Sequence, residues 1–218
     1  SCAIVRDVDL TEDALLQAMQ LQEKLHGTYC RNRRAASIGI YNLDKIDDEI
    51  VYEAVNPDRI HFAPLEHSEQ MTGIGILSET AKGKEYGHII QHLPKFPLLR
   101  DVEGQVLSMP PVINSEDTKV EVSTESIFID VTSMKQDLAD RVLNIMVANI
   151  AERRGAIESV TVAYHDGTYT TPRLQPHTVI LQPSRAREML GVKMTGRQIK
   201  ELLGKMRCGA TGARTLRV

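Results

Sequence analysis

The sequence feature that most constrains the fold is a pair of prolines, Pro110 and Pro111, directly after a strand-like run. Proline fixes φ and has no N–H to donate to a sheet ladder. The run 106–109 must therefore stop there, and the chain continues as an extended turn toward Asn114. We expect this turn to present Asn114 at a fixed place.

A second strand is predicted at 127–132, a short distance downstream. Apolar side chains recur on one face at period two and predict a core: Ile127, Ile129 and Val131. The other face carries an acid and a hydroxyl: Phe128, Asp130 and Thr132. Ser108, Asn114, Asp130 and Thr132 are therefore expected to converge on one pocket. From the residues alone a simpler interpretation stays open, in which Asn114 caps a turn, Asp130 ends a strand and Thr132 begins a helix.

Length and composition are those of a globular protein. The 218 residues suit one sizeable domain, or one domain with a small neighbour, and the content is 42% hydrophobic and 25% charged. Aromatic residues are only 4%, so the core must rest on Leu, Ile, Val and Met. The net charge of −3 argues against a generally basic nucleic-acid wrapper, so RNA contacts would need local patches.

Cysteine usage and hydropathy exclude further classes. Cys2, Cys30 and Cys208 have no paired spacing, which fits a reducing cytosol and gives neither a disulfide framework nor a zinc site. No apolar run approaches the ~18 residues of a membrane span, and no signal-peptide pattern occurs. The chain begins inside a strand-like run and ends in a module that looks cut short, so we expect a fragment of a longer protein.

Periodicity and turn signals predict alternating helices and strands. Helices are expected at 11–26, 71–80, 83–91, 133–153, 184–191 and 195–206. Strands are expected at 3–5, 35–41, 51–55, 60–63, 96–100, 105–109, 127–132, 157–164, 168–170 and 178–181. The hairpin over 96–109 is predicted to place Leu99 opposite the region of Ser108.

Helix caps and buried stripes can also be assigned from the residues. The expected N-caps are Thr11, Thr132 or Ser133, Ser184 and Thr195. The first helix is expected to bury Ala14, Ala18, Leu21 and Leu25. The helix after 132 is expected to bury Leu138, Val142, Ile145 and Asn149, with Met146 and Ile150 beside them.

The fold class that follows is α/β (α+β), with mixed β-sheets flanked by helices. A boundary at Thr171-Pro172 separates 1–170 from 171–218. The second range carries two short helices and is predicted to be a truncated, small winged-helix-like module.

The sequence lacks the motifs of nucleotide binding, of serine hydrolases and of metal sites. No phosphate-binding glycine loop occurs, and Ser108 has no G-x-S-x-G context. His88 and His92 have the i,i+4 spacing of a metal pair, but no third ligand is placed to help, which favours a solvated helix face. No metal site is therefore predicted.

A compact basic cluster follows the first helix, with Arg31, Arg33 and Arg34. Two interpretations stay open: a solvated helix end, where cations are favoured, or a clamp for phosphate or ribose of RNA.

Blocks of sequence that carry a family resemblance run in one order along the chain: Leu21–His26, Arg33–Arg34, Ile38–Ile40, Asn42–Asp44, Gly83–Gly87, Phe96–Leu99, Leu107–Pro111, Ile113–Asn114 and Phe128–Thr132. Together they resemble the phenylalanyl-tRNA synthetase beta subunit of the archaeal and eukaryotic type. One departure is Ser133-Met134, where the family usually has Gly-Thr.

The resemblance implies that 1–170 is the family's editing domain and that 171–218 begins the following small domain. In this family the alpha subunit makes phenylalanyl-tRNA, and the beta subunit hydrolyses tyrosyl-tRNA made in error. A second sieve is needed because a hydrophobic pocket rejects one extra hydroxyl only roughly a hundredfold. The positions matching the family's editing pocket are Leu99, Ser108, Asn114, Asp130 and Thr132, with Gln22 and Arg33 on the helix-and-loop side.

The resemblance also suggests roles. Ser108 or Asp130 would read the tyrosine phenol, and Asn114 and Thr132 would hold the amino group or position water at the ester. Leu99 would pack on the ring, and Arg33 would hold the terminal adenosine or its phosphate.

The resemblance further implies cytoplasmic location, no membrane, and three partners: tRNA(Phe), mischarged tyrosyl-tRNA, and the alpha subunit in a heterotetramer. No cofactor is expected in this part, whereas ATP and Mg would serve the whole synthetase. The alternative is a non-catalytic module for tRNA docking or subunit assembly. A free-standing nucleic-acid-binding protein using helices within 178–206 is a third candidate, against which the net negative charge, Glu188 and Glu201 count.

Overall fold

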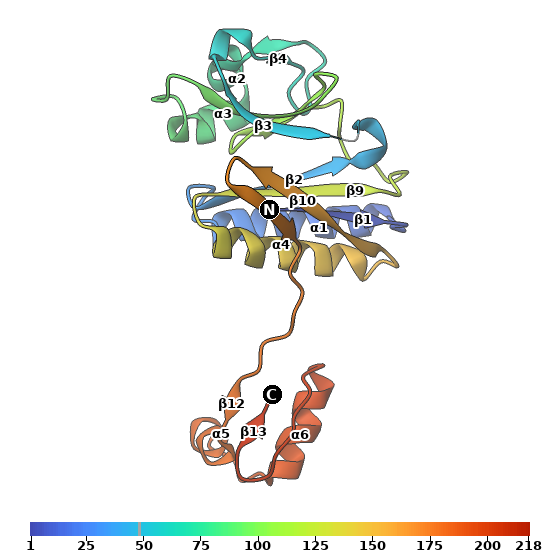
Figure 1. Cartoon of the computed structure of the whole chain (residues 1–218), viewed down its shortest axis with the longest axis vertical. Coiled ribbons are helices and arrows are strands. Elements are labelled where there is room, and N and C mark those ends of the chain that lie inside the picture. Colours follow the sequence, from blue (N-terminus) through green and yellow to red (C-terminus); the bar gives the residue numbers. More distant parts are fainter. Residues whose placement is uncertain (48) are drawn as a thin grey trace. The chain divides into compact units, whose positions relative to one another are not determined.

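The predicted strand at 127–132 forms β9 (Ile127–Ser133), which lies inside a five-stranded sheet of order β11-β10-β1-β9-β2 in a computed structural model (Figure 1). The structure describes residues 1–47 and 49–218. The other strands of this first sheet are β1 (Cys2–Arg6), β2 (Ala36–Asn42), β10 (Ala156–Tyr164) and β11 (Gly167–Thr171). Each pairing in it is antiparallel.

One face of the first sheet is covered by two helices, α1 (Glu12–Gly27) and α4 (Gln136–Ala151) (Figure 1). Ile127, Ile129 and Val131 of β9 point into this core, as their period-two spacing predicted. Thr11 caps α1 by accepting a hydrogen bond from the Ala14 N–H at 3.1 Å, which confirms the predicted start of that helix.

A second antiparallel sheet, of order β3-β6-β7-β8, covers the other face of the first. Its strands are β3 (Ile50–Val55), β6 (Phe96–Asp101), β7 (Val106–Met109) and β8 (Ile113–Asn114). β7 ends directly before Pro110, as the missing donors require. The register pairs Leu99 with Ser108, which confirms the predicted hairpin.

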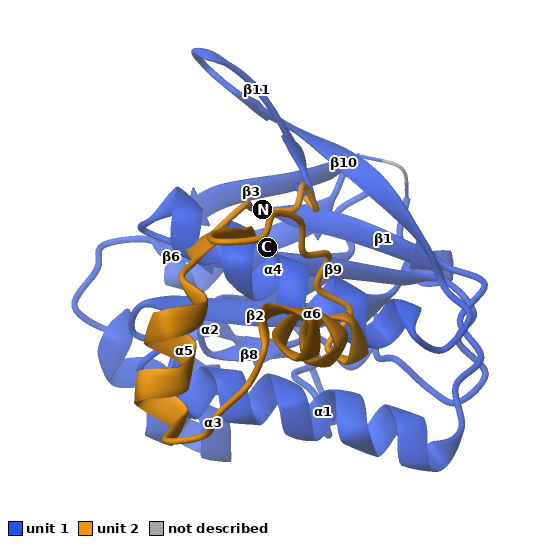
Figure 2. Cartoon of the chain, turned by 90° about the horizontal axis from the view of Figure 1, so that it is seen from below, with its two compact units in different colours: residues 1–173 blue, residues 174–218 orange. Residues whose placement is uncertain are grey.

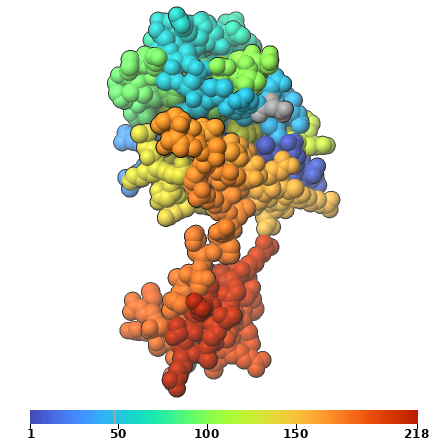
Figure 3. Space-filling model, in the orientation of Figure 1, coloured from blue at the N-terminus to red at the C-terminus, as the bar shows by residue number. Residues whose placement is uncertain are grey.

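Short elements complete the outer side of the second sheet. They are η1 (Leu43–Lys45), η2 (Pro57–Arg59), β4 (His61–Phe62), β5 (Met71–Thr72), α2 (Gly73–Glu79), α3 (Ala81–Tyr86) and η3 (Gly87–Ile89). Apolar side chains of α2 and α3 pack with those of β6 and β7 in a core of their own. The layer order is therefore helices, sheet, sheet, helices, and in Figure 3 the segment that holds the second sheet lies directly on the first.

The chain divides into two compact units, Ser1–Arg173 and Leu174–Val218 (Figure 2). The second holds β12 (Ile180–Leu181), α5 (Pro183–Leu190), α6 (Gly196–Lys205) and β13 (Leu216–Arg217), with β12 and β13 paired antiparallel. The α/β class with sheets flanked by helices is confirmed, whereas the likeness of the second unit to a winged helix stays a prediction.

Several predicted boundaries were wrong. Residues 71–72 form a strand and not the start of a helix. The two helices that follow join at Thr80, whose hydroxyl caps α3, so the second begins at Ala81 and not at residue 83. Thr132 and Ser133 both belong to β9, so neither is an N-cap; α4 begins after Lys135 without a side-chain cap.

The buried stripe of α4 is displaced from the predicted one because the helix begins later and meets the sheet along a neighbouring row of residues. It consists of Ala139, Val142, Leu143, Met146, Val147 and Ile150, whereas Ile145 is 40% exposed. In the second unit Ser184 lies inside α5, which begins at Pro183, a residue suited to the first helical turn. Thr195 caps α6 through a capping box, as predicted.

Candidate functional site

The face between the two sheets holds a buried polar cluster within an apolar surround. Tyr41 of β2 directs its hydroxyl to Ser108 of β7 and to Asp130 of β9, with O···O distances of 2.7 Å to Ser108 Oγ and 2.7 Å to Asp130 Oδ1. All three side chains are at most 3% exposed. Three strands from two sheets therefore place three oxygens at one point.

Gly39 makes room for this cluster. A Cβ at this position would lie 1.9 Å from Tyr41 Oη and 2.2 Å from Asp130 Oδ1, far inside van der Waals contact. Gly39 pairs with Asp130 in the register of β2 and β9, so its missing side chain leaves the space that the Tyr41 hydroxyl occupies. Any other residue would separate Tyr41 from Asp130.

Two cavities lie beside this cluster and share several lining residues. The smaller, of about 10 Å³, has room for one water and is lined by Arg33, Ser37, Ile38, Gly39, Tyr41, Ser108, Pro110, Pro111, Ile113, Asn114 and Asp130. The larger, of about 330 Å³, has mainly apolar walls, and its lining includes Gln22, Glu23, Arg33, Ile38, Ile113 and Asn114. A volume of that size is typical of small-ligand sites.

The structure brings together five of the seven residues that the family resemblance predicts. Ser108 and Asp130 line the small cavity, Gln22 lines the large one, and Arg33 and Asn114 line both. The two others, Thr132 and Leu99, line neither cavity but contact residues beside them. Thr132 bonds to the cavity residue Ser37, with 2.6 Å between their hydroxyl oxygens, and Leu99 packs with Tyr41 in the apolar surround.

The double-proline turn and β8 fix the backbone of Asn114. This residue pairs with Ser108 in the sheet, and its carbonyl oxygen accepts a hydrogen bond from the Leu65 N–H at 2.9 Å. The side-chain amide makes only a long 3.4 Å contact to the Ile40 carbonyl oxygen. Asn114 therefore has a fixed backbone and a lightly held amide, which suits a ligand contact better than a turn cap.

Arg33 reaches the cavities from a loop with unusual backbone geometry. Arg31, Asn32 and Arg33 all have left-handed φ values, of 53°, 53° and 62°. Such conformations are uncommon outside glycine and cost energy, so they persist where the surroundings enforce them. Here the loop turns the Arg33 side chain inward, to 10% exposure.

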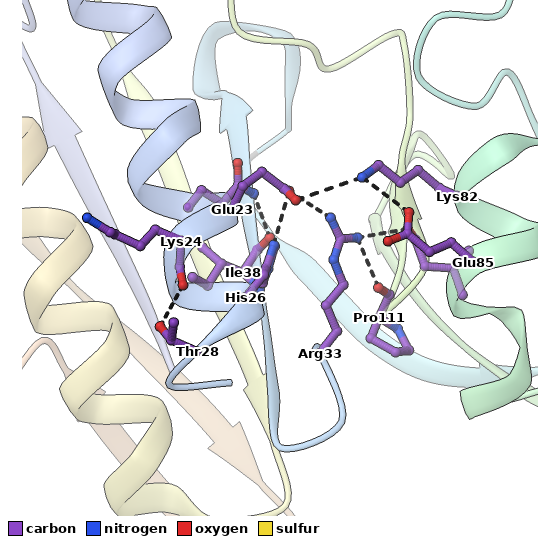
Figure 4. Close-up of polar contacts among 11 residues, drawn as sticks. Glu23, Lys24, His26, Thr28, Arg33, Ile38, Lys82, Glu85 and Pro111 are labelled. Atoms are coloured by element: carbon purple, nitrogen blue, oxygen red, sulfur yellow. Dashed lines mark hydrogen bonds and ion pairs between the residues drawn. The ribbon is translucent and has the colours of Figure 1, made fainter. Parts of the chain in front are cut away.

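The guanidinium of Arg33 connects helix α1 with the double-proline turn (Figure 4). It donates to Glu23 of α1 at 2.9 Å and to the carbonyl oxygens of Pro111 and Val112 at 3.2 Å and 3.0 Å, and it lies over the Tyr86 ring. Its Nε is buried without a hydrogen-bond partner within the described ranges. Arg31 and Arg34 are exposed, and their contact with RNA stays a prediction.

His26, which the sequence did not indicate, holds Glu23 in place. The Ile38 N–H donates to His26 Nε2 at 2.9 Å, so the imidazole proton sits on Nδ1, which lies 3.2 Å from Glu23 Oε1. The hydrogen bond with His26 and the charge of Arg33 lower the pKa of Glu23 to about 2. Burial lowers the pKa of His26, so the imidazole stays neutral and Glu23 stays ionised at neutral pH.

Burial has the opposite effect on Asp130. Loss of hydration raises the pKa of this carboxyl to about 6, although the hydrogen bond from Tyr41 partly opposes the shift. The same burial, together with the nearby charge of Asp130, raises the pKa of Tyr41 well above its usual value. At neutral pH the pair is therefore a neutral phenol that donates to an ionised carboxylate.

Tyr41 and Gly39 are the members of this cluster that motif reasoning missed. The available signal was a tyrosine in an apolar strand two positions after a glycine, which becomes informative only once the two sheets are known to face each other. No group of three or more His, Cys, Asp or Glu side chains suited to a metal ion occurs in the described part of the chain. His88 lies in η3 and not on an α-helix shared with His92.

No family model matches the chain, but individual relatives do. It is 45% identical over 205 residues to the phenylalanine--tRNA ligase beta subunit of Thermococcus sibiricus, which covers 94% of this chain and 37% of that protein. It is 41% identical over 211 residues to the corresponding subunit of Methanococcoides burtonii, with 96% and 39% covered. The chain thus spans less than two-fifths of the length of these relatives.

A solved structure gives the same result. An N-terminal fragment of the phenylalanyl-tRNA synthetase beta subunit from Pyrococcus horikoshii matches with a TM-score of 0.91 and 44% identity, covering 99% of this chain and 63% of that one. These matches place the chain among the aminoacyl-tRNA synthetases, as a section of a subunit. It belongs to the family of phenylalanyl-tRNA synthetase beta subunits, which confirms the resemblance seen in the sequence.

Within the described residues, no helix is long and apolar enough to cross a bilayer.

Proposed function

We propose that this chain is an editing module that hydrolyses tyrosyl-tRNA(Phe), the mischarged product of phenylalanine--tRNA ligase. The observation that carries the proposal is the convergence of Gln22, Arg33, Ser108, Asn114 and Asp130 on two adjoining cavities. Four separate stretches of chain supply these side chains, and their chemistry matches the parts of an aminoacyl ester.

The polar floor of the small cavity suits the hydroxyl of a phenol, because the cavity volume of about 10 Å³ would hold one oxygen while the ring lies in the larger cavity. Ser108 and Asp130 already hold one phenol oxygen, that of Tyr41, with two bonds of ordinary length. The apolar side chains around the two cavities, Ile38 and Ile113 among them, suit an aromatic ring. A tyrosyl side chain would satisfy both features, while a phenylalanyl side chain would leave the polar floor without a partner.

The ester would lie nearer the rim, beside Asn114. In the reaction a water oxygen attacks the carbonyl carbon, the bond from that carbon to the ribose oxygen breaks, and the water proton passes to the ribose oxygen. The products are tyrosine and tRNA with a free 3′ end. The amide N–H of Asn114 can donate to the carbonyl oxygen as negative charge develops on it.

Arg33 and Thr132 have supporting roles. Arg33 lines both cavities, and its buried Nε has no hydrogen-bond partner among the described residues, so we propose that a phosphate or ribose oxygen of the terminal adenosine accepts from this guanidinium. Thr132 lines neither cavity and would act by orienting Ser37, which lines the small one. The synthetase alpha subunit and tRNA(Phe) are the partners we propose. No metal is included, and retention of activity in a chelator would test that expectation.

The test is a deacylation assay with tyrosyl-tRNA(Phe) and phenylalanyl-tRNA(Phe). Asn114→Ala is expected to slow tyrosyl release by ~10²–10³ with little change in Tm, because it removes one pre-placed donor. Asn56→Ala, which removes the side chain that caps η2, is the matched control and should keep full activity. An Asn114→Ala protein that stays fully active would contradict the role of Asn114.

A non-catalytic tRNA-docking module is the second candidate. The observation that favours it is the charge of residues 174–218, which hold nine Lys or Arg and two Asp or Glu. A wild-type chain that binds tRNA but releases neither amino acid would support docking over editing.

A further inference from the structure

We propose that Tyr41 is a specificity-determining residue, which directs the hydrogen bonds of the Ser108–Asp130 floor so that the site offers only acceptors to its ligand. The ligand class is an aromatic amino acid ester with a hydrogen-bond donor at the para position. This inference rests on the proposed ester hydrolysis and adds a residue and a rule of selection to it.

The first step is that Tyr41 is a permanent part of the site. Its ring is 1% exposed and stacks on Phe128 with 5.9 Å between ring centroids. Leu99 and Leu107 of the second sheet belong to the same apolar cluster. The hydroxyl occupies the space left by Gly39. A ligand cannot displace this side chain without separating the two sheets.

The second step is a proton inventory. A phenol hydroxyl has one proton to donate and lone pairs to accept with. The Tyr41 proton goes to Asp130 Oδ1, because an ionised carboxylate can only accept. The contact between Tyr41 and Ser108 must then run the other way, with Ser108 Oγ–H donating to Tyr41 Oη. Each of the two protons is committed inside the cluster.

The third step is what remains for a ligand. Ser108 keeps an oxygen lone pair, and Asp130 keeps its second carboxylate oxygen, Oδ2. Both residues line the small cavity. An O–H or N–H group at the para position of a ring would satisfy these acceptors. An unsubstituted ring would leave these acceptors without a hydrogen bond. An ether oxygen, which is itself an acceptor, would be repelled by them.

Single-turnover deacylation by the full chain, with four tRNA(Phe) esters, tests this rule. The amino acids are tyrosine, 4-aminophenylalanine, O-methyltyrosine and phenylalanine. The wild-type chain is expected to release the first two, which carry para donors, and to spare the last two. Rapid release of O-methyltyrosine would overturn the acceptor-only floor, since this ester has an oxygen but no proton to donate.

Tyr41→Phe removes the oxygen that commits the two protons while keeping the ring. The preference for tyrosyl over phenylalanyl ester is expected to fall about 10- to 100-fold, through a loss of kcat/KM on the tyrosyl ester alone. A purely structural role would lower both rates together. Tyr164→Phe, at a tyrosine of β10 that is 50% exposed, is the matched control and should change neither rate.

Unchanged or faster tyrosyl release by a folded Tyr41→Phe protein would overturn the inference and leave the editing function standing. A wild-type chain that releases none of the four esters would instead defeat the proposed function. If Tyr41→Phe does not fold, Asp130→Asn gives the same information, because it replaces an acceptor by a group that can donate. It should narrow the preference of tyrosine over O-methyltyrosine, and an unchanged preference would contradict the rule.

Discussion

The two compact units of the chain differ in how much apolar surface they bury. In the described part of residues 1–173, three buried clusters are built from two larger sheets, the two-stranded sheet of β4 and β5, and four α-helices. In residues 174–218 the buried hydrophobic side chains are Ile199 and Leu216, while Ile180, Met189 and Met206 are among the large apolar ones that stay mostly exposed. Below about 40–50 residues a chain rarely builds a sufficient core alone. The first unit therefore has its own source of stability, and the second does not.

The two units also differ in net charge. Nine basic and two acidic residues give 174–218 a net charge of +7, and since the whole chain carries −3, the first unit carries −10. The overall negative charge, which counted against nucleic-acid binding in the sequence, therefore belongs to one unit only. The candidate site and the net positive charge therefore lie on different parts of this chain.

Hydrogen exchange should show the largest difference between the units. Amides of β9 and β2, in the centre of the first unit, are expected to exchange slower than those of β12 and β13 by on the order of 10³-fold, because local opening of a unit with little core costs far less free energy. Mass spectrometry of peptides from the intact chain measures this. Equal protection would show that the second unit is stabilised by contacts other than its own core.

A pair of matched isoleucine substitutions tests the difference in burial. Ile129→Ala in β9, at 0% exposure, is expected to cost about 2–5 kcal/mol of unfolding free energy. Ile180→Ala in β12, at 58% exposure, should stay within about 0.5 kcal/mol. Urea melts of both variants provide the measurement. A large decrease for Ile180→Ala would mean that this side chain is buried in solution.

Asp130 should give the first unit a pH dependence that the second lacks. Its folded pKa of about 6 lies above its ordinary value of 3.8, so the stabilising effect of the bound proton is full below about pH 4 and is lost as the pH rises through 6. The free energy of unfolding of Asp130→Asn, measured relative to the wild type, should therefore increase by roughly 1–3 kcal/mol as the pH rises from 4 to 7.

The control for this pH series is Glu188→Gln on α5, whose exposed carboxylate lies 3.8 Å from Arg185. Because water surrounds this ion pair, removing the carboxylate charge should change the free energy of unfolding only slightly. A constant difference for Asp130→Asn would mean that Asp130 titrates normally.

The smallest expected effect concerns RNA. Replacing Lys193, Lys200 and Lys205 by Gln should weaken tRNA binding about tenfold and flatten its salt dependence by about one unit of slope for each phosphate group that the chain no longer neutralises. Replacing three exposed lysines of the first unit, Lys84, Lys95 and Lys135, should change affinity far less. A reversed result would locate the RNA-binding surface on the acidic unit.

The fold could be predicted best where the pattern is local. The hairpin that pairs Leu99 with Ser108 follows from two strand-like runs around Gly104, and the two faces of β9 follow from its alternation. The predicted start of α4 was wrong because hydroxyls at 132 and 133 look like caps, while pairing with β2 keeps both residues in the strand. Long-range sheet pairing outweighs local cap chemistry here.

The site was predictable only in part, for a related reason. Ser108, Asn114 and Asp130 lie in blocks that resemble the family, so the sequence could indicate them. Tyr41 and Gly39 act together only because two sheets bring β2 against β7, where Tyr41 meets a residue 67 positions away. A contact between residues so far apart in the sequence cannot be predicted from a local pattern. Arg33 was expected at the site, but the sequence does not indicate the three successive left-handed residues that lead its side chain inward.

The position of β1 in the first sheet has a consequence for how the chain folds as it leaves the ribosome. Within residues 1–218 this strand is made before both of its neighbours, so its edge toward β9 stays open until about residue 133 has been made and its edge toward β10 until about residue 160. The second sheet draws on residues 50–114 alone, and its pairings can close earlier. The edges of β1 therefore stay unpaired while more than a hundred further residues are synthesised. During that time a chaperone or a neighbouring chain can bind them.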